Sequence, residues 1–93
     1  MTLEDEITQG QDADMLLHNP AYQRAIMGVR EGIISAMQQS AMGDDHTHNR
    51  LVIALQLLGQ IERNIKTASE TGKLARMQVE ETKAQKLRRV VGF

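Results

Sequence analysis

The sequence has no cysteine and no tryptophan, and its 93 residues include one phenylalanine, one tyrosine and one proline. Because cysteine is absent, the chain can form neither a disulfide framework nor a thiolate metal site. Because aromatic side chains are so few, the interior must be built from leucine, isoleucine, valine, methionine and alanine, which pack well between helices. These absences favour an all-α fold.

Long apolar runs are also absent, and none approaches the length needed to span a membrane. The amino terminus is acidic where a secretory signal would be basic and then apolar. We therefore expect a cytoplasmic protein that does not enter a membrane. A chain of this length buries only a modest fraction of its surface, so many such proteins complete their cores by forming oligomers.

The net charge is −1, but the charges are distributed unevenly. The first 20 residues contain no lysine or arginine, and their acidic residues are Glu4, Asp5, Glu6, Asp12 and Asp14. After Glu81 the sign reverses, and the charged residues are Lys83, Lys86, Arg88 and Arg89. Such asymmetry favours antiparallel or head-to-tail contacts and charged partners. The alternative is that the charges only keep the two ends of the chain solvated.

Two helices are predicted in the first half of the chain. Thr2 and Asp5 have the spacing of a capping box, so the first helix covers residues 3–17. Asn19 is a favoured N-cap and Pro20 suits the first helical position, so the second helix starts there. Apolar residues at steps of three and four give this second helix a seam. The seam consists of Tyr22, Ile26, Val29, Ile33, Ala36 and Ser40, with Met37 beside it.

The second helix is expected to end at Met42, with Gly43 just beyond it and a polar turn supplying the next N-cap. A third helix of about 40 residues follows, and the short connection makes the two helices antiparallel neighbours. The predicted organisation is an acidic helix over residues 1–18, a helical hairpin over 19–85 with its turn near 43–47, and a basic and apolar tail over 86–93.

The third helix carries a longer seam than its hairpin partner can cover. Its apolar and small residues alternate at steps of three and four from Leu51 to Val79, so this stripe must lie against another helix. At about 1.5 Å per residue the second helix reaches only half of the seam, and the rest is left to the first helix or to a neighbouring chain. We expect a coiled-coil-type homo-oligomer, unless Gly72 ends or kinks the helix. The residues expected to mediate self-association are Leu58, Ile61, Ile65, Ala68, Gly72, Ala75 and Val79.

The carboxyl end forms a second expected contact surface. Gly92 can release the chain from the helix, so that Phe93 enters an apolar pocket with an acidic rim on a partner. The alternative is that Phe93 packs on the protein's own helices or frays. The residues expected to dock the partner are Lys86, Arg88, Arg89, Val91 and Phe93.

No motif for catalysis, metal binding or a cofactor occurs. His46 and His48 are two residues apart, a spacing that does not aim both imidazoles at one ion, so they are assigned to an exposed polar turn. Glu80 and Glu81 have no serine, cysteine or histidine in a recognisable relation to them. We predict that the protein is not an enzyme and needs no cofactor. We also predict weak or no binding of nucleic acid, because basic residues are few and no DNA-binding motif accompanies them.

Several short segments spread over most of the chain form a pattern. They are Gly10, Leu16-Leu17-x-x-Pro20, Asp44-Asp45 in the turn, Leu57-Leu58, and Glu70-Thr71-Gly72-Lys73-Leu74-Ala75. The pattern resembles a group of short helical proteins encoded by tailed bacteriophages. Members of that group are associated with virion structure and assembly. The resemblance implies a non-enzymatic assembly factor or minor virion protein, found in the host cytoplasm or the virion, whose partner is a phage structural or assembly protein.

Two other functions remain open. A small terminase-like DNA-packaging subunit also oligomerises through helical hairpins, but such a subunit usually brings a basic helix-turn-helix, whereas residues 1–20 here are acidic. A small inhibitor of a host enzyme would use the acidic amino terminus to imitate nucleic acid, although the acidic block is short for that task.

Overall fold

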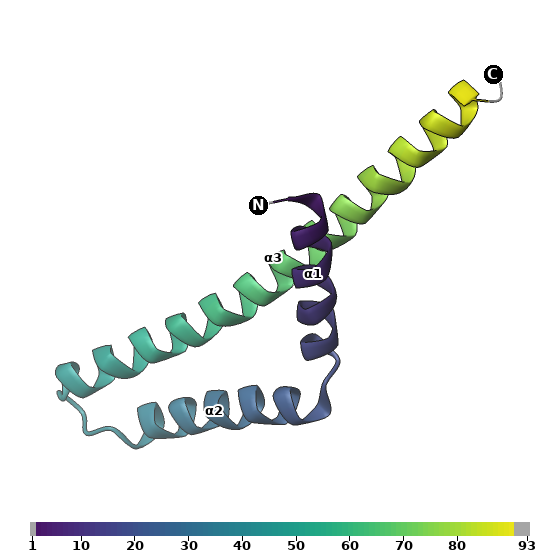
Figure 1. The fold of residues 1–93 in the computed structure, drawn as a ribbon. Coiled ribbons are helices and arrows are strands. Elements are labelled where there is room, and N and C mark those ends of the chain that lie inside the picture. The colour runs from purple at the N-terminus through teal and green to yellow at the C-terminus, as the bar shows by residue number, and fades with distance from the viewer. Residues whose placement is uncertain (1, 91–93) are drawn as a thin grey trace. The chain divides into compact units, whose positions relative to one another are not determined.

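The computed structural model describes residues 2–90, which form three helices and no strand (Figure 1). The helices are α1 (Leu3–Leu17), α2 (Pro20–Gln39) and α3 (Asp45–Val90). The predicted all-α class with a helical hairpin is therefore confirmed. The chain divides into two compact units. We call Leu16–Asn64 the hairpin unit, and we call the residues up to Met15 together with those from Ile65 on the crossing unit.

The first two helices begin where the sequence predicts. The Asp5 backbone N–H donates to Thr2 Oγ1 at 3.1 Å, and the Thr2 N–H donates to the Asp5 carboxylate at 3.4 Å, which completes the capping box. The Asn19 side-chain oxygen accepts two backbone N–H groups of the first turn of α2, at 2.8 and 3.1 Å. With Pro20 at the first helical position, these bonds satisfy donors that a helix start otherwise leaves unpaired.

The predicted end of α2 at Met42 is wrong, because α2 ends at Gln39. The Ser40 hydroxyl donates to the Met37 carbonyl oxygen at 2.7 Å, and the Ser40 backbone is extended, so this residue closes the helix. Gly43 has a φ of 90° and lies in the turn that follows. Glycine is favoured there because other residues rarely adopt a positive φ. Its predicted position directly after the helix is therefore also wrong.

Asp44 is the N-cap of α3. Its carboxylate accepts the Thr47 backbone N–H at 3.2 Å. Hydrogen bonding from Thr47 lowers the pKa of the Asp44 carboxyl, because the bond favours the ionised form. An anion at this position also interacts favourably with the positive end of the helix dipole.

Helix α3 is continuous from Asp45 to Val90, a length of 46 residues. It passes through Gly72, so the alternative in which this glycine ends the helix is wrong. Residues 86–90 are helical, although the sequence analysis assigned them to a tail. The expected docking residues Val91 and Phe93 lie outside the described residues.

In the hairpin unit, α2 lies antiparallel to the first part of α3 (Figure 1). Leu58 is buried, with 7% of its surface exposed, and the contact face of α2 is half-buried. The half-buried residues of α2 are Tyr22, Ile26, Arg30, Ile33, Ala36 and Met37. Because two helices shield only the stripe between them, no large side chain of this unit is fully enclosed.

In the crossing unit, α1 and α3 touch through their backbones. A Cβ built on Gly10 would lie 2.5 Å from Gly72 Cα, and a Cβ on Gly72 would lie 2.6 Å from Gly10 Cα. Small neighbours complete the contact, since Ala13, Ser69 and Ala75 are 8%, 3% and 2% exposed. Close approach of two helices requires such small residues at the crossing point.

We predict that Gly10→Ala and Gly72→Ala each weaken the crossing unit. The added methyl group meets backbone atoms that cannot move aside, so overpacking costs about 1–3 kcal/mol and outweighs the gain of at most about 1 kcal/mol in helix propensity. Gly28→Ala is the matched control, because a Cβ there meets nothing within 4 Å, and this change should be neutral or stabilising. Urea unfolding followed by circular dichroism measures all three; equal stability of Gly10→Ala and Gly28→Ala would contradict the backbone contact.

We predict an acid-sensitive start for α3. Because the pKa of Asp44 is lowered in the folded protein, its stabilising effect is complete above the unfolded-state pKa of about 3.9 and is lost as the pH falls through the lower, folded value. Asp44→Asn keeps a capping side chain but cannot titrate. Thermal unfolding between neutral pH and pH 3 should show a smaller acid loss in Asp44→Asn than in the natural protein. Identical losses would rule out this role.

Candidate interaction surfaces

The residues predicted to mediate self-association are divided between the two units. In the crossing unit, Gly72 and Ala75 are buried, whereas Ile65, Ala68 and Val79 are half-buried. The α1 helix of the same chain therefore covers the centre of this half of the seam. In the hairpin unit, Leu58 is buried, whereas Ile61 is 51% exposed. Ile61 thus departs from its predicted place in the contact between α2 and α3.

Glu62, the neighbour of Ile61, forms an ion pair between the hairpin helices. The Arg30 guanidinium contacts the Glu62 carboxylate, and the two side chains are 40% and 35% exposed. The seam spacing allows either Val29 or Arg30 to face α3, and either Ile61 or Glu62 to face α2. Glu62 takes the position that faces α2, so Ile61 is turned away by about 100°, the angle between successive helix residues. Val29 lies at the edge of the contact face of α2 and is 51% exposed.

Three apolar side chains of α3 form an exposed row. Ile53, Leu57 and Ile61 are spaced by four residues and are 54%, 60% and 51% exposed, and residues at this spacing share one side of a helix. We call this row the ridge. It turns gradually around α3, so Ile61 lies nearest to α2 and Ile53 farthest from it. Residues 51–61 include no charged residue, so the ridge is uninterrupted by charge.

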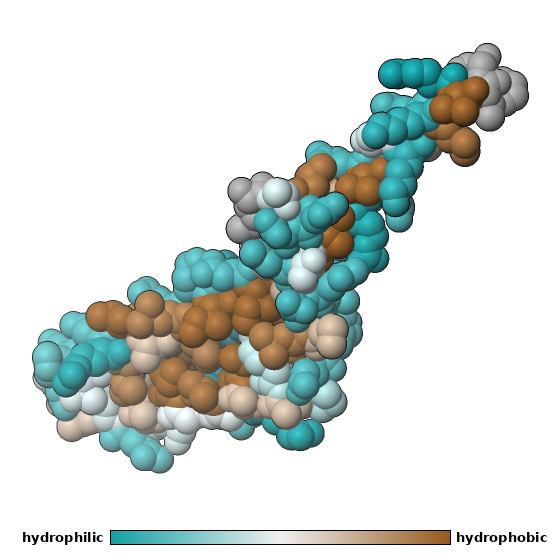
Figure 2. Space-filling model, viewed as in Figure 1, coloured by the Kyte–Doolittle hydropathy of each residue, from teal (hydrophilic) through white to brown (hydrophobic). Residues whose placement is uncertain are grey.

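On the same flank as Ile61, α2 presents small residues, of which Gly32 lies beside the Ile61 end of the ridge. Ala25, Gly28 and Gly32 are all exposed, and a Cβ added at either glycine would meet nothing within 4 Å. We call these three residues the strip; Val29, 51% exposed, borders it. Viewed from its own N-terminus, each helix carries these residues on the same side of its contact face. Because α2 and α3 are antiparallel, these two sides face the same way, so the ridge near Ile61 and the strip share one face of the hairpin. Apolar side chains gather on one face of α2 and α3 in Figure 2.

The opposite flank of the hairpin is different. Ile34 is 40% exposed there on α2, but on α3 the Arg63 guanidinium lies over Gly59, with Nη1 3.3 Å from the position of an added Cβ. A charged side chain that covers the surface keeps this flank hydrated. The two flanks therefore differ in chemistry, and the ridge and strip form the more apolar one.

The sequence analysis missed Ile53, Leu57 and the strip as surface residues. Two features of the sequence could have revealed the ridge. Its apolar residues recur every four positions beside the predicted seam, and residues 51–61 include no charged residue. Seam spacing by itself could not separate this row from the contact face, because the two lie side by side on α3.

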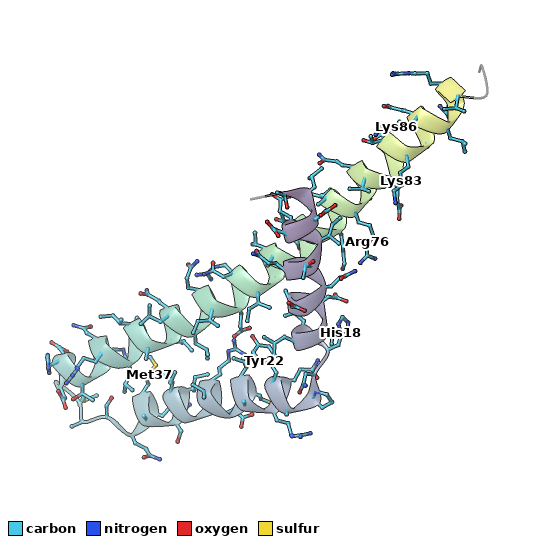
Figure 3. All side chains as sticks on the ribbon, in the orientation of Figure 1. His18, Tyr22, Met37, Arg76, Lys83 and Lys86 are labelled. Carbon is cyan, nitrogen blue, oxygen red and sulfur yellow. The ribbon has the colours of Figure 1, made fainter. Side chains whose placement is uncertain are left out.

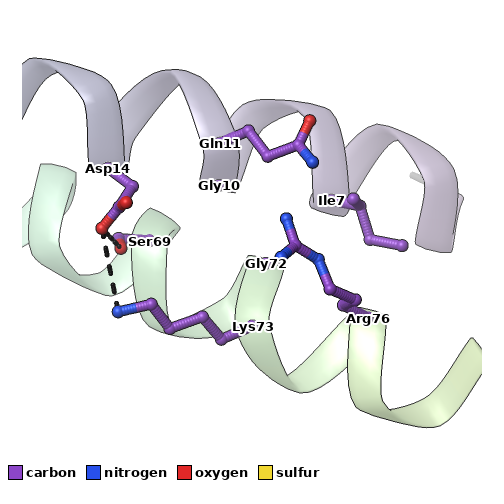
Figure 4. Close-up of a pocket in the computed structure, with 8 residues that line it drawn as sticks. All are labelled: Ile7, Gly10, Gln11, Asp14, Ser69, Gly72, Lys73 and Arg76. Atoms are coloured by element: carbon purple, nitrogen blue, oxygen red, sulfur yellow. Dashed lines mark hydrogen bonds and ion pairs between the residues drawn. The ribbon is translucent and has the colours of Figure 1, made fainter. Parts of the chain in front are cut away.

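The crossing unit holds a small cleft (Figure 4). Ser69 Oγ donates to Asp14 Oδ1 at 3.3 Å, and Lys73 Nζ lies 3.7 Å from the same oxygen. The cleft volume is about 60 Å³, far below the several hundred Å³ of typical small-molecule sites. Its polar groups therefore fasten α1 to α3. The lining residues are Ile7, Gly10, Gln11, Asp14, Ser69, Gly72, Lys73 and Arg76.

The basic end of α3 is exposed along its whole length. All residues from 80 to 90 are exposed, including Lys86, Arg88 and Arg89. Figure 3 shows Lys83 and Lys86 on this end of the helix. These cations also suit the negative end of the helix dipole. Lys86, Arg88 and Arg89, the basic residues that the sequence analysis expects to dock a partner, are therefore accessible to solvent.

The turn between α2 and α3 forms a second, open cavity of about 280 Å³, whose lining includes Asp44, Asp45 and His48. The Asp44 carboxylate is engaged by the Thr47 N–H. No group of three or more histidine, aspartate or glutamate residues placed to hold a metal ion occurs within residues 2–90.

In the described part of the chain, no helix combines the length and the apolar character needed to cross a membrane. Comparisons of the chain with protein families, with curated proteins and with solved structures gave no match.

Proposed function

We propose that this chain is a non-enzymatic helical interaction protein that self-associates through the ridge-and-strip face of its hairpin unit. The observation that supports the proposal is the exposure of Leu57 and Ile61 at 60% and 51%, on the flank of the hairpin that also carries the uncharged strip of α2. Scattered exposed apolar residues are normal on protein surfaces, but a contiguous apolar face indicates a contact site.

The dimensions of the face suit a small protein interface. The 20 residues of α2 give a length of about 30 Å, and two helices side by side give a width of about 20 Å, or roughly 600 Å². Specific interfaces bury about 800 Å² on each partner. The hairpin face therefore suits an association of moderate strength, which depends on protein concentration.

The charge of the hairpin unit favours a second copy as the partner. Its four arginines equal its four carboxylates in number, so the net charge is zero with histidine neutral. Two such units do not repel each other. A strongly charged partner would gain little from this face, because charge complementarity requires a charged surface on both sides.

The setting of this activity is proposed from the resemblance to short phage proteins. We propose a role in virion assembly or as a minor virion component, in which self-association is combined with docking of another phage component. The exposed basic end at Lys86, Arg88 and Arg89 supports the docking role. A terminase-like subunit or an inhibitor of a host enzyme remains the alternative, and the acidic block of residues 1–20 argues against binding of DNA.

We predict that light scattering at tens of micromolar gives at least twice the 10.4 kDa mass of one chain. Leu57→Asp should reduce the mass to that of one chain, because a carboxylate placed in an apolar contact is costly to desolvate. Helicity should remain, since Leu57 is 60% exposed in the single chain.

Ile34→Asp is the matched control for this experiment. Ile34 is an exposed apolar residue on the opposite flank of the hairpin, so this variant should keep the mass of the natural protein. A natural protein that is monomeric and fully helical at this concentration contradicts the proposal. Equal dissociation by both variants would place the interface elsewhere.

A further inference from the structure

We infer that two copies of the chain pack with their α3 helices antiparallel, about a two-fold axis that passes through the ridge at Leu57. The axis is perpendicular to α3, so it reverses the direction of the helix. The inference rests on the proposed self-association and adds its arrangement and its central residue. The partner is a second copy of this chain.

The ridge is symmetric about Leu57. Ile53 precedes Leu57 by four residues and Ile61 follows it by four, and all three are more than half exposed. A rotation that reverses α3 about Leu57 places Ile53 of one copy at the level of Ile61 of the other. Leu57 of each copy then meets its own counterpart. Each large side chain of the ridge therefore lies against apolar surface of the other copy, which removes that surface from water.

The polar residues that bound the ridge select this direction of packing. Arg50 lies seven residues before Leu57 and Asn64 lies seven residues after it, and both are exposed. Seven residues make almost two whole turns, so these three residues follow one line on α3. Antiparallel packing places Arg50 of one copy opposite Asn64 of the other, where the guanidinium can donate to the amide oxygen. Parallel packing would place Arg50 opposite Arg50, and like charges in a contact repel each other.

The amide oxygen of Asn64 is positioned for this contact. Its Oδ1 accepts Gln60 Nε2 at 2.8 Å within α3, and an amide oxygen has a second lone pair that can accept another donor. The strip leaves room beside it. Gly28 and Asn64 each lie two residues from the Arg30–Glu62 contact, in the same direction along the hairpin, so they lie at one level. A Cβ at Gly28 would meet nothing within 4 Å, so this level is open for a long side chain from the other copy.

A two-fold interface of this kind is closed. An isologous contact uses the same patch on both copies, so both ridges and both sets of bounding polar residues are used within one pair. The arrangement therefore predicts a dimer through this face, without growth into larger species.

Cysteine cross-linking tests the direction of packing, since the natural chain has no cysteine that could interfere. Ile53→Cys and Ile61→Cys proteins are oxidised mildly at tens of micromolar, each alone and as a mixture. In the antiparallel pair the two different positions share one level, whereas each lies about 12 Å along the helix from its own counterpart. A disulfide needs Cβ atoms about 4 Å apart. We expect the mixed dimer to form at least several times faster than either homodimer.

Two further cysteine variants serve as controls. Leu57→Cys should link readily to itself, because this residue lies on the two-fold axis. Ile34→Cys should give no comparable link with any of the others, because Ile34 lies on the opposite flank of the hairpin. The replaced side chains are exposed in the single chain, at 40% or more, so circular dichroism should show the helicity of the natural protein in all four variants.

Asn64→Asp provides a second test that does not depend on oxidation. It places a carboxylate opposite Arg50 of the other copy, so the dissociation constant of the dimer should fall by about twofold or more at low salt. Added salt should reduce this gain. Gln39→Glu is the matched control, because it adds the same charge on the side of α2 turned away from α3, nine residues or two and a half turns after Arg30. It should leave the dissociation constant unchanged. Light scattering over a dilution series measures both.

The outcomes separate this inference from the proposed function. Faster linking of Ile53→Cys or Ile61→Cys to itself than to the other overturns the antiparallel arrangement while self-association stands. An unchanged or weaker dimer of Asn64→Asp does the same, since parallel packing would bring the two new carboxylates together. A monomeric natural protein overturns both.

Discussion

The ion pair between Arg30 and Glu62 links α2 to α3 in the hairpin unit, and the apolar side chains beside it are divided between the helix contact and solvent. Both residues are more than a third exposed, so the pair contributes about 1 kcal/mol or less to stability. Glu62 lies between the helices and Ile61 points outward, so the apolar surface of α3 is split between an internal contact and an external face. In coiled coils a polar residue at one contact position likewise sets the register of the helices at some cost in stability.

The two units satisfy the same constraint by different means. A narrow apolar stripe must be covered by another helix. In the crossing unit the stripe is made of small residues, and α1 covers it so closely that Gly10 and Gly72 meet through their backbones. In the hairpin unit the residues are larger and only two helices are present, so part of the apolar surface stays exposed. This contrast explains why we assign self-association to the hairpin face and leave the Gly72 region to the contact within the chain.

Much of this fold follows from local rules in the sequence. The Thr2–Asp5 capping box and the Asn19–Pro20 start were predictable because caps depend on neighbouring residues, and the long seam indicated α3. The end of α2 could not be predicted in this way, because Ser40 and Gly43 are both residues that can end a helix. In the structure α2 ends at Ser40, whose hydroxyl donates to the Met37 carbonyl oxygen. The exposed face was also missed. Its position depends on whether Ile61 or Glu62 faces α2. The partner helix decides this, and the spacing of residues within one helix does not reveal it.

In the proposed self-association, the flank at Ile61 is an interface in solution and the flank at Ile34 is not. Both isoleucines are exposed in the single chain, at 51% and 40%, so a soluble paramagnetic agent would broaden both methyl signals equally if no association occurred. In isoleucine-methyl-labelled protein at high concentration, we predict that Ile61 is shielded while Ile34 is broadened, and that dilution removes the difference. Equal broadening of the two methyl groups at every concentration would contradict the account.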